Sequence, residues 1–112
     1  MGHTRVIYTD ATTAEAASAL KGCGYLESSD GGLFTSPSSK VKVYVVWGKS
    51  AYYPEILALL DFTPRIQIHI KSRENGSDLA ELAIGTVNNL RGIAPATLVR
   101  VFNADDRQEI SC

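Results

Sequence analysis

Few residues in this 112-residue chain combine the types and spacing that catalysis requires. A thiol nucleophile with a histidine base is one such combination, and Cys23, which lies between two glycines, together with His69 could supply it. However, Cys23 falls at the predicted C-terminal end of a helix, where the helix dipole disfavours a thiolate. A small residue at such a position is usually a packing residue. We therefore expect no catalytic residue and no enzymatic activity.

Acidic residues near the C-terminus raise the possibility of a site for a hard cation. Asp105, Asp106 and Glu109 are close in sequence, and Asp10 could join them at a sheet edge. Neighbouring carboxylates in a polar segment are usually solvated charges, and the two histidines lack further ligands at zinc spacing. The sequence therefore predicts no metal and no other cofactor.

The most informative pattern is the alternation of polar and apolar residues along the segment 65–71. Its isoleucines alternate with polar residues, which is typical of a strand with one face toward solvent. If helices cover the isoleucine face, the other face presents basic and aromatic side chains that suit a binding surface. An ordinary solvated face is the alternative. The candidate partner-binding residues are Lys42, Tyr44, Tyr52, Tyr53, Gln67, His69 and Arg100.

Extended and helical segments alternate along the chain and would position these residues. Strands are predicted at 5–9, 33–35, 40–47, 65–71 and 96–102, with a brief edge strand at 25–27. Helices are predicted at 14–21, 52–60 and 77–90, the first after a capping-box pattern of Thr12 and Glu15. Residues 103–112 are a loose tail or a final short element. The expected fold is α/β (α+β), a two-layer sandwich in which a mixed sheet of about five strands carries three helices mainly on one face.

Length and charge set the remaining limits. The chain has the size of a single domain, 1–112. Its formal charge of −1 gives no general footprint for nucleic acid, which would require a basic face. Its apolar stretches are shorter than the roughly 20 residues that span a bilayer. We therefore expect no nucleic-acid or membrane partner, and the two widely spaced cysteines fit a cytoplasmic location.

The C-terminal half resembles small immunity proteins that bacteria make against their own contact-delivered or secreted toxins. The resemblance depends on the 65–71 strand, the helix 78–90 ending in Asn88-Asn89-Leu90-Arg91, and the segment Leu98-Val99-Arg100-Val101-Phe102-Asn103-Ala104-Asp105. Some such families have Leu-Leu-Arg and Asn-Gly-Glu where this chain has Asn-Leu-Arg and Asn-Ala-Asp. The resemblance covers roughly a third of the chain. It implies a bacterial protein without catalysis that blocks a toxin by binding it.

These observations together predict a non-catalytic protein-binding module, an immunity or inhibitor protein that neutralises a cognate bacterial toxin by direct binding. One alternative is a small enzyme or ligand-binding domain with a pocket near the Tyr52–Leu60 helix, using Tyr53, His69 and Asp10. A second alternative is a homo-oligomeric interaction protein that associates through an exposed strand edge.

Overall fold

Seven strands form one antiparallel sheet in the computed structural model, which describes residues 2–28, 32–37, 40–73 and 79–111. Their order across the sheet is β2-β3-β4-β5-β1-β6-β7. The strands are β1 (His3–Thr9), β2 (Leu26–Glu27), β3 (Leu33–Thr35), β4 (Val41–Trp47), β5 (Ile66–Ser72), β6 (Val99–Asn103) and β7 (Gln108–Ile110). The α/β class is confirmed. The sheet is antiparallel rather than mixed, however, and larger than the predicted five strands.

The central part of the sheet is built from two interleaved β-α-β units, β1-α1-β4 and β5-α3-β6. The helices are α1 (Thr13–Gly22) and α3 (Leu79–Ile93). In each unit the two strands are parallel to one another but separated by a strand of the other unit, so every neighbouring pair is antiparallel. This is the split β-α-β, or ferredoxin-like, arrangement. The β2-β3 hairpin and β7 extend it at its two edges.

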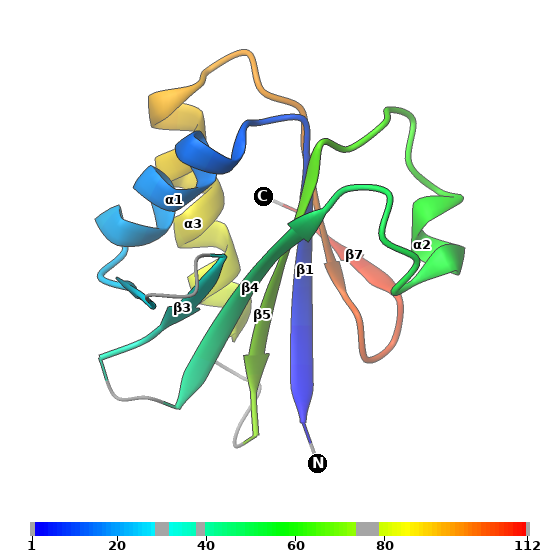
Figure 1. Ribbon diagram of the computed structural model, residues 1–112. Coiled ribbons are helices and arrows are strands. Elements are labelled where there is room, and N and C mark those ends of the chain that lie inside the picture. The colour runs from blue at the N-terminus through cyan, green and yellow to red at the C-terminus, as the bar shows by residue number, and fades with distance from the viewer. Residues whose placement is uncertain (1, 29–31, 38–39, 74–78, 112) are drawn as a thin grey trace.

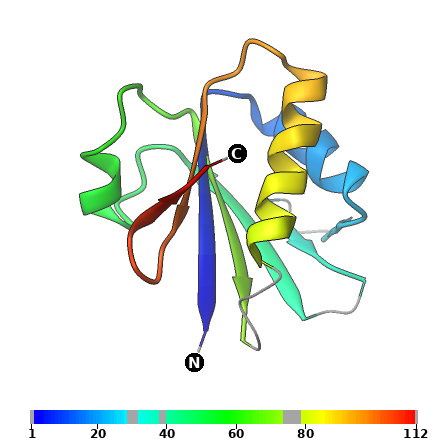
Figure 2. The ribbon, with the colours of Figure 1, turned by 180° about the vertical axis from the view of Figure 1, so that it is seen from behind.

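Helices α1 and α3 lie side by side on one face of the sheet (Figures 1 and 2). The core between these helices and the sheet contains the isoleucine side of β5, as predicted, together with apolar residues of β1, β4 and β6. The capping box predicted at the start of α1 is present, because Thr12 Oγ1 accepts from the Glu15 amide and Glu15 accepts from the Thr12 amide. No helix among the described residues has the length and apolar character needed to cross a membrane.

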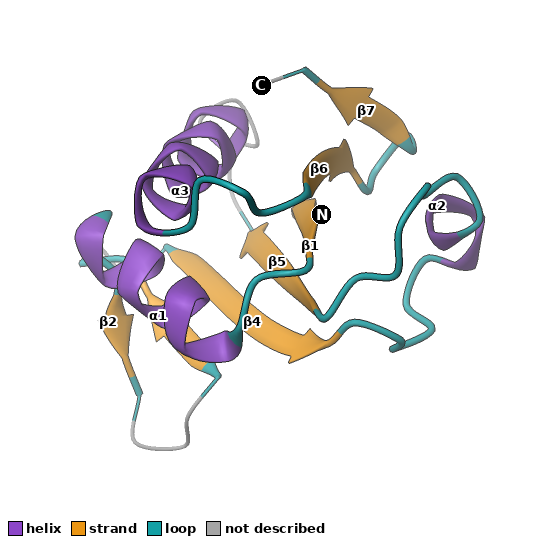
Figure 3. Cartoon of the chain, turned by 90° about the horizontal axis from the view of Figure 1, so that it is seen from above, coloured by secondary structure: helices purple, strands orange, loops and turns teal. Residues whose placement is uncertain are grey.

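The short helix α2 (Pro54–Leu57) lies on the opposite face of the sheet (Figure 3). It is a single turn with Pro54 in its first turn, whereas the sequence predicts a longer helix at 52–60. Ile56 packs against Val6, Tyr8 and Phe102, so this second face has an apolar core of its own. Residues 48–64, called the cover segment below, therefore form a partial third layer. The prediction of three helices mainly on one face holds for α1 and α3 and is wrong for α2.

Candidate functional site

The second face of the sheet is divided into a covered half and an open half. Along β5 the side chains that point to this face are Gln67, His69 and Lys71; the first two are 0% and 2% exposed, while Lys71 is exposed. The cover segment therefore covers this face as far as His69 and leaves Lys71 exposed. The covered half consists of Val6, Tyr8, Gln67, His69 and Phe102. The open half consists of Thr4, Lys42, Tyr44, Val46, Lys71 and Arg73.

Gln67 belongs to the covered half, so its assignment as an exposed contact residue is wrong. Its Nε2 donates to the carbonyl oxygens of Gly48 and Ser50 at 3.0 and 2.8 Å. These carbonyls belong to the cover segment and lie outside any helix or strand, so they need a side-chain donor when they are buried. Gln67 thus fastens the start of the cover segment to the sheet.

His69 is also buried, contrary to the prediction, and lies beneath two tyrosines. The Tyr52 ring lies edge-on to the His69 ring with 5.0 Å between the ring centres, and the Tyr53 ring stacks on it with 5.7 Å between the ring centres. Because Gln67 Nε2 donates twice, its Oε1 must accept, and His69 Nε2 therefore carries the proton of their 2.8 Å hydrogen bond. Burial, with a smaller contribution from the charge of Lys71, lowers the pKa of His69 to about 4. The ring is neutral at physiological pH and serves as a structural donor.

Arg100 is occupied by intramolecular contacts and is not a free contact residue. Its Nε and Nη2 donate to the two carboxylate oxygens of Glu109 at 2.8 and 2.7 Å, and its Nη1 donates to the Leu59 carbonyl at 2.8 Å. The hydrogen bonds between the two side chains raise the pKa of Arg100 and lower that of Glu109. The contacts join β6, β7 and the cover segment. Glu109 lies in a strand where the sequence predicts a tail or short element.

A second arginine fastens the cover segment from the β6-β7 turn. Arg107 Nε donates to Glu55 at 3.0 Å, and its guanidinium lies 5.0 Å from the Tyr53 ring centre. Tyr53 is half-buried as a result, between this cation and His69. Of the seven candidate contact residues, Gln67 and His69 are buried, Arg100 is held by an ion pair, and Tyr53 is half-buried between His69 and Arg107. The side chains that remain available at the surface are those of Lys42, Tyr44 and Tyr52.

The open half is hollowed at the end where β1 begins and β5 ends. The hollow encloses about 620 Å³ and is lined by Gly2, His3, Thr4, Lys40, Lys42, Tyr44, Lys71, Ser72 and Arg73. Lys42 and Lys71 are directly opposite one another on β4 and β5. The alternation along 65–71 places Lys71 on this face, but neither Lys71 nor Arg73 is among the predicted partner-binding residues. Their proximity to Lys42 depends on the β4-β5 pairing, which no local pattern reveals.

The two groups considered for nucleophilic catalysis do not meet. Cys23 is the C-cap of α1, on the helix side of the sheet, where its sulfur accepts from Asn89 Nδ2 at 3.2 Å. His69 points to the other face and is enclosed by tyrosines. The sheet lies between them. In the alternative trio, Tyr53 and His69 are in ring contact, whereas Asp10 follows the end of β1 and accepts from the Leu98 amide.

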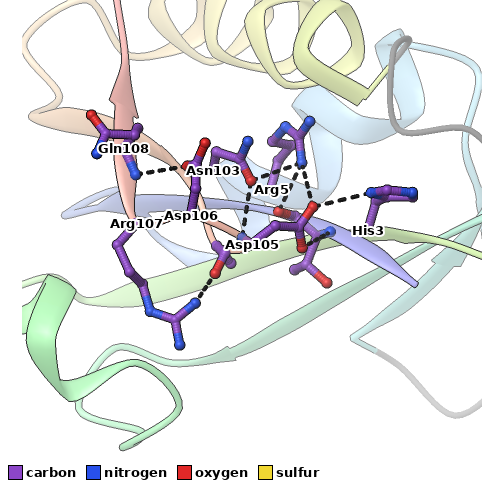
Figure 4. A network of polar contacts seen from close by, with 9 residues as sticks. His3, Arg5, Asn103, Asp105, Asp106, Arg107 and Gln108 are labelled. Atoms are coloured by element: carbon purple, nitrogen blue, oxygen red, sulfur yellow. Dashed lines mark hydrogen bonds and ion pairs between the residues drawn. The ribbon is translucent and has the colours of Figure 1, made fainter. Parts of the chain in front are cut away.

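The acidic residues considered for a cation site each have a different partner. Asp105 accepts from His3 and Arg5 at 3.2 Å, and Asp106 accepts from the Gln108 amide at 3.0 Å (Figure 4). Glu109 pairs with Arg100 on the other face. Among the residues that the structure describes, no three histidine, cysteine or acidic side chains form a group suited to a metal ion.

Comparison with known proteins was made at two levels. The chain matches no model of a known protein family, and no curated protein sequence matches it. The features of the molecule that bear on function are therefore the division of the second sheet face and the chemistry of its open half.

Proposed function

We propose that this chain is a non-catalytic protein-binding module, an inhibitor of the immunity type that acts in the bacterial cytoplasm and neutralises a toxin by direct binding. The observation that carries the proposal is the open half, with the adjoining ring of Tyr52. Lys42 and Tyr44 stand on the long central strand β4, and Tyr52 is 58% exposed beside them. Aromatic and cationic side chains on a rigid support are the residues that most often anchor a protein interface.

The positions of the reactive groups support a role in binding rather than in catalysis. A nucleophile and its base must lie within hydrogen-bond distance of one another, or be joined through one water. Cys23 and His69 lie on opposite faces of the sheet, and His69 is held as a neutral donor to Gln67. The resemblance of the 65–105 region to immunity proteins supplies the choice of a toxin as the partner.

An affinity pull-down with the full chain from its source lysate tests the proposal. We expect wild type to capture one protein in stoichiometric amount, and the double variant Tyr44→Ser/Tyr52→Ser to lose it. The matched control is Ile93→Ser/Leu98→Ser, which removes exposed apolar groups at the α3-β6 connection. Capture of no protein, or equal capture by all three chains, contradicts the proposal. The captured protein must also inhibit growth when expressed alone and lose this effect when the chain is coexpressed.

A small-ligand function is the second candidate, favoured by a hollow beside the cover segment. This hollow encloses about 160 Å³ and is lined by Tyr44, Val46, Tyr52, His69 and Lys71. Small-molecule sites usually enclose roughly 300–1,000 Å³, so this one suits a single side chain better than a metabolite. A metabolite or metal that raises the melting temperature in a thermal-shift screen would support this candidate instead.

Self-association is less well supported by the edges of the sheet. The described edge strands are β2, with two residues, and β7, with three. Such short edges offer few free backbone groups to a second chain. Sedimentation at several concentrations distinguishes a monomer from an oligomer.

A further inference from the structure

Two lysines face one another across the strands of the open half. Lys42 and Lys71 are direct cross-strand neighbours on β4 and β5, in the central part of the sheet. Like charges in this relation destabilise a sheet. Neither lysine forms an ion pair with a described carboxylate, and the Lys71 ammonium instead lies 5.5 Å from the Tyr44 ring centre. The folded chain therefore retains an unfavourable contact that an anionic ligand would relieve.

Further cations surround this pair. Lys40 and Arg73 line the same hollow of about 620 Å³ together with the imidazole ring of His3, and none of the described lining residues is acidic. His3 has an acidic partner, Asp105, outside the lining. The chain as a whole carries a formal charge of −1, so this concentration of positive charge is a local property of one end of the sheet. A hollow with one sign of charge attracts ligands of the opposite sign.

The basic hollow adjoins the smaller hollow beside the cover segment. The two share Tyr44 and Lys71 in their linings. We call the two hollows together the track. It follows β4 from Lys42 to Val46 over about 13 Å, at the usual rise of a strand. It is basic at one end, and at the other it is lined by Val46, Tyr52 and neutral His69. A compact anion would occupy one end only, whereas an extended peptide would fill both.

We propose that this track binds an acidic segment of the partner protein, in which carboxylates reach Lys42, Lys71 and Arg73 and a neighbouring apolar or aromatic side chain enters the hollow beneath Tyr52. The inference rests on the proposed function and names the chemistry of its partner. Carboxylates near the lysines relieve their mutual repulsion and accept charge-assisted hydrogen bonds. The same field steers the encounter, so the association rate falls as salt rises.

Peptide display against the immobilised full chain tests this choice without knowledge of the partner. From a random library we expect enrichment of sequences with two or more acidic residues followed or preceded, within about four positions, by an apolar or aromatic residue. The charge-reversed variant Lys42→Glu/Lys71→Glu should lose these sequences. The control Lys21→Glu/Lys49→Glu has the same net charge but alters lysines outside the track lining, and should retain them.

Affinity measurements on one enriched peptide give the size of the effect. We expect the charge-reversed variant to bind at least about tenfold more weakly than wild type and the control. Enrichment of basic or neutral sequences would overturn the proposal, as would equal binding by the two variants. Pyrophosphate or a short single-stranded oligonucleotide that binds the chain more tightly than any enriched peptide would assign the hollow to phosphates and also overturn it.

The outcome separates this inference from the proposed function. If wild type and Lys42→Glu/Lys71→Glu capture the same protein equally from lysate, the module binds a partner but not through an acidic segment, and only this inference fails. If no protein is captured while acidic peptides bind, the proposed function fails, whereas the inference that the track binds acidic segments stands.

Discussion

The covered and open halves of the second sheet face differ in what their polar side chains contact. In the covered half, Gln67 is paired with two backbone carbonyls and His69 with Gln67, while the buried hydroxyl of Tyr8 has no described hydrogen-bond partner and its ring packs edge-on against Phe102. In the open half, Lys42 and Lys71 lie opposite one another without a described acidic partner. Both pairs include residues of β5, where Gln67, His69 and Lys71 are successive side chains on the same face of the strand. What separates them is the cover segment, whose residues contact the first pair and stop short of the second.

This difference teaches how polar residues on one strand acquire different functions. A buried polar group needs a partner, because an unpaired one costs about 1–3 kcal/mol. An exposed cation has water and needs none, so it can be kept for a ligand. We therefore expect substitutions in the covered half to change stability, and substitutions in the open half to change binding with little loss of stability.

The largest stability loss is expected at the base of the cover segment. A Cβ atom at Gly48 would lie 2.0 Å from the Pro64 carbonyl oxygen and 2.7 Å from the Arg65 carbonyl carbon. Both are backbone atoms, so the chain must move, and Gly48→Ala should lower the free energy of unfolding by roughly 4 kcal/mol in denaturant titration. Gly85→Ala is the control: its Cβ meets nothing within 4 Å, and it should stabilise α3 by about 0.5–1 kcal/mol. Equal effects of the two changes would contradict the close approach at Gly48.

The next effect is a pH dependence that belongs to His69. Its pKa is lowered to about 4 in the folded chain from 6.5 in the unfolded chain. The unfolded state therefore binds more protons between these values, and the contribution to stability is complete above pH 6.5 and is lost as pH falls toward 4. The loss is about 3 kcal/mol in full.

Denaturant titrations of wild type and His69→Gln between pH 7.5 and 4.5 measure this contribution. The variant should lose less stability than wild type over that range. His3→Gln, at the partly exposed histidine that pairs with Asp105, serves as the control. Parallel curves for wild type and His69→Gln would show that His69 titrates normally and is not enclosed.

A smaller loss is expected when Gln67 is replaced. Gln67→Leu keeps the approximate volume but leaves the Gly48 carbonyl and the His69 Nε2–H without their partner. The free energy of unfolding should fall by about 2 kcal/mol. Gln108→Leu, on an exposed position of the edge strand β7, should change it by less than about 0.5 kcal/mol. A Gln67→Leu protein as stable as wild type would mean that the amide does not hold the cover segment.

The smallest effect has the opposite sign and lies in the open half. Lys42→Glu replaces a like-charge pair by an opposite-charge pair across β4 and β5. We expect stabilisation of about 0.2–1 kcal/mol at low salt, and less at high salt. Thr35→Glu is a useful comparison, because Thr35 faces Lys42 from β3. Destabilisation by Lys42→Glu would indicate that Lys42 already has a favourable partner.

The sequence was sufficient for features that depend on local patterns. The alternation of β5 identified its buried side, and the Thr12-Glu15 spacing identified the cap of α1, because both signals lie within a few residues. The apolar residues of 56–60 also predicted packing of that segment on a core. Its face could not be predicted, since Ile56 fits the helix side and the Val6-Tyr8-Phe102 side equally well by hydrophobicity alone.

The candidate site was predicted in part for the same reason. Lys42, Tyr44 and Tyr52 were identified as surface residues of the correct face, whereas Gln67, His69 and Arg100 were assigned to solvent because alternation alone cannot reveal a third layer. The Lys42–Lys71 pair and the Arg100–Glu109 pair arise from strand pairing. Such pairs become visible only when the order of the strands is known.

The most direct test of the division into halves is lysine reactivity in the complex with the captured partner. Acetylation followed by mass spectrometry compares Lys42 and Lys71 in the open half with Lys21 and Lys49 elsewhere. We expect the partner to protect Lys42 and Lys71 and to leave Lys21 and Lys49 as reactive as in the free chain. Unchanged reactivity of Lys42 and Lys71, together with protection of the other two, would contradict the account.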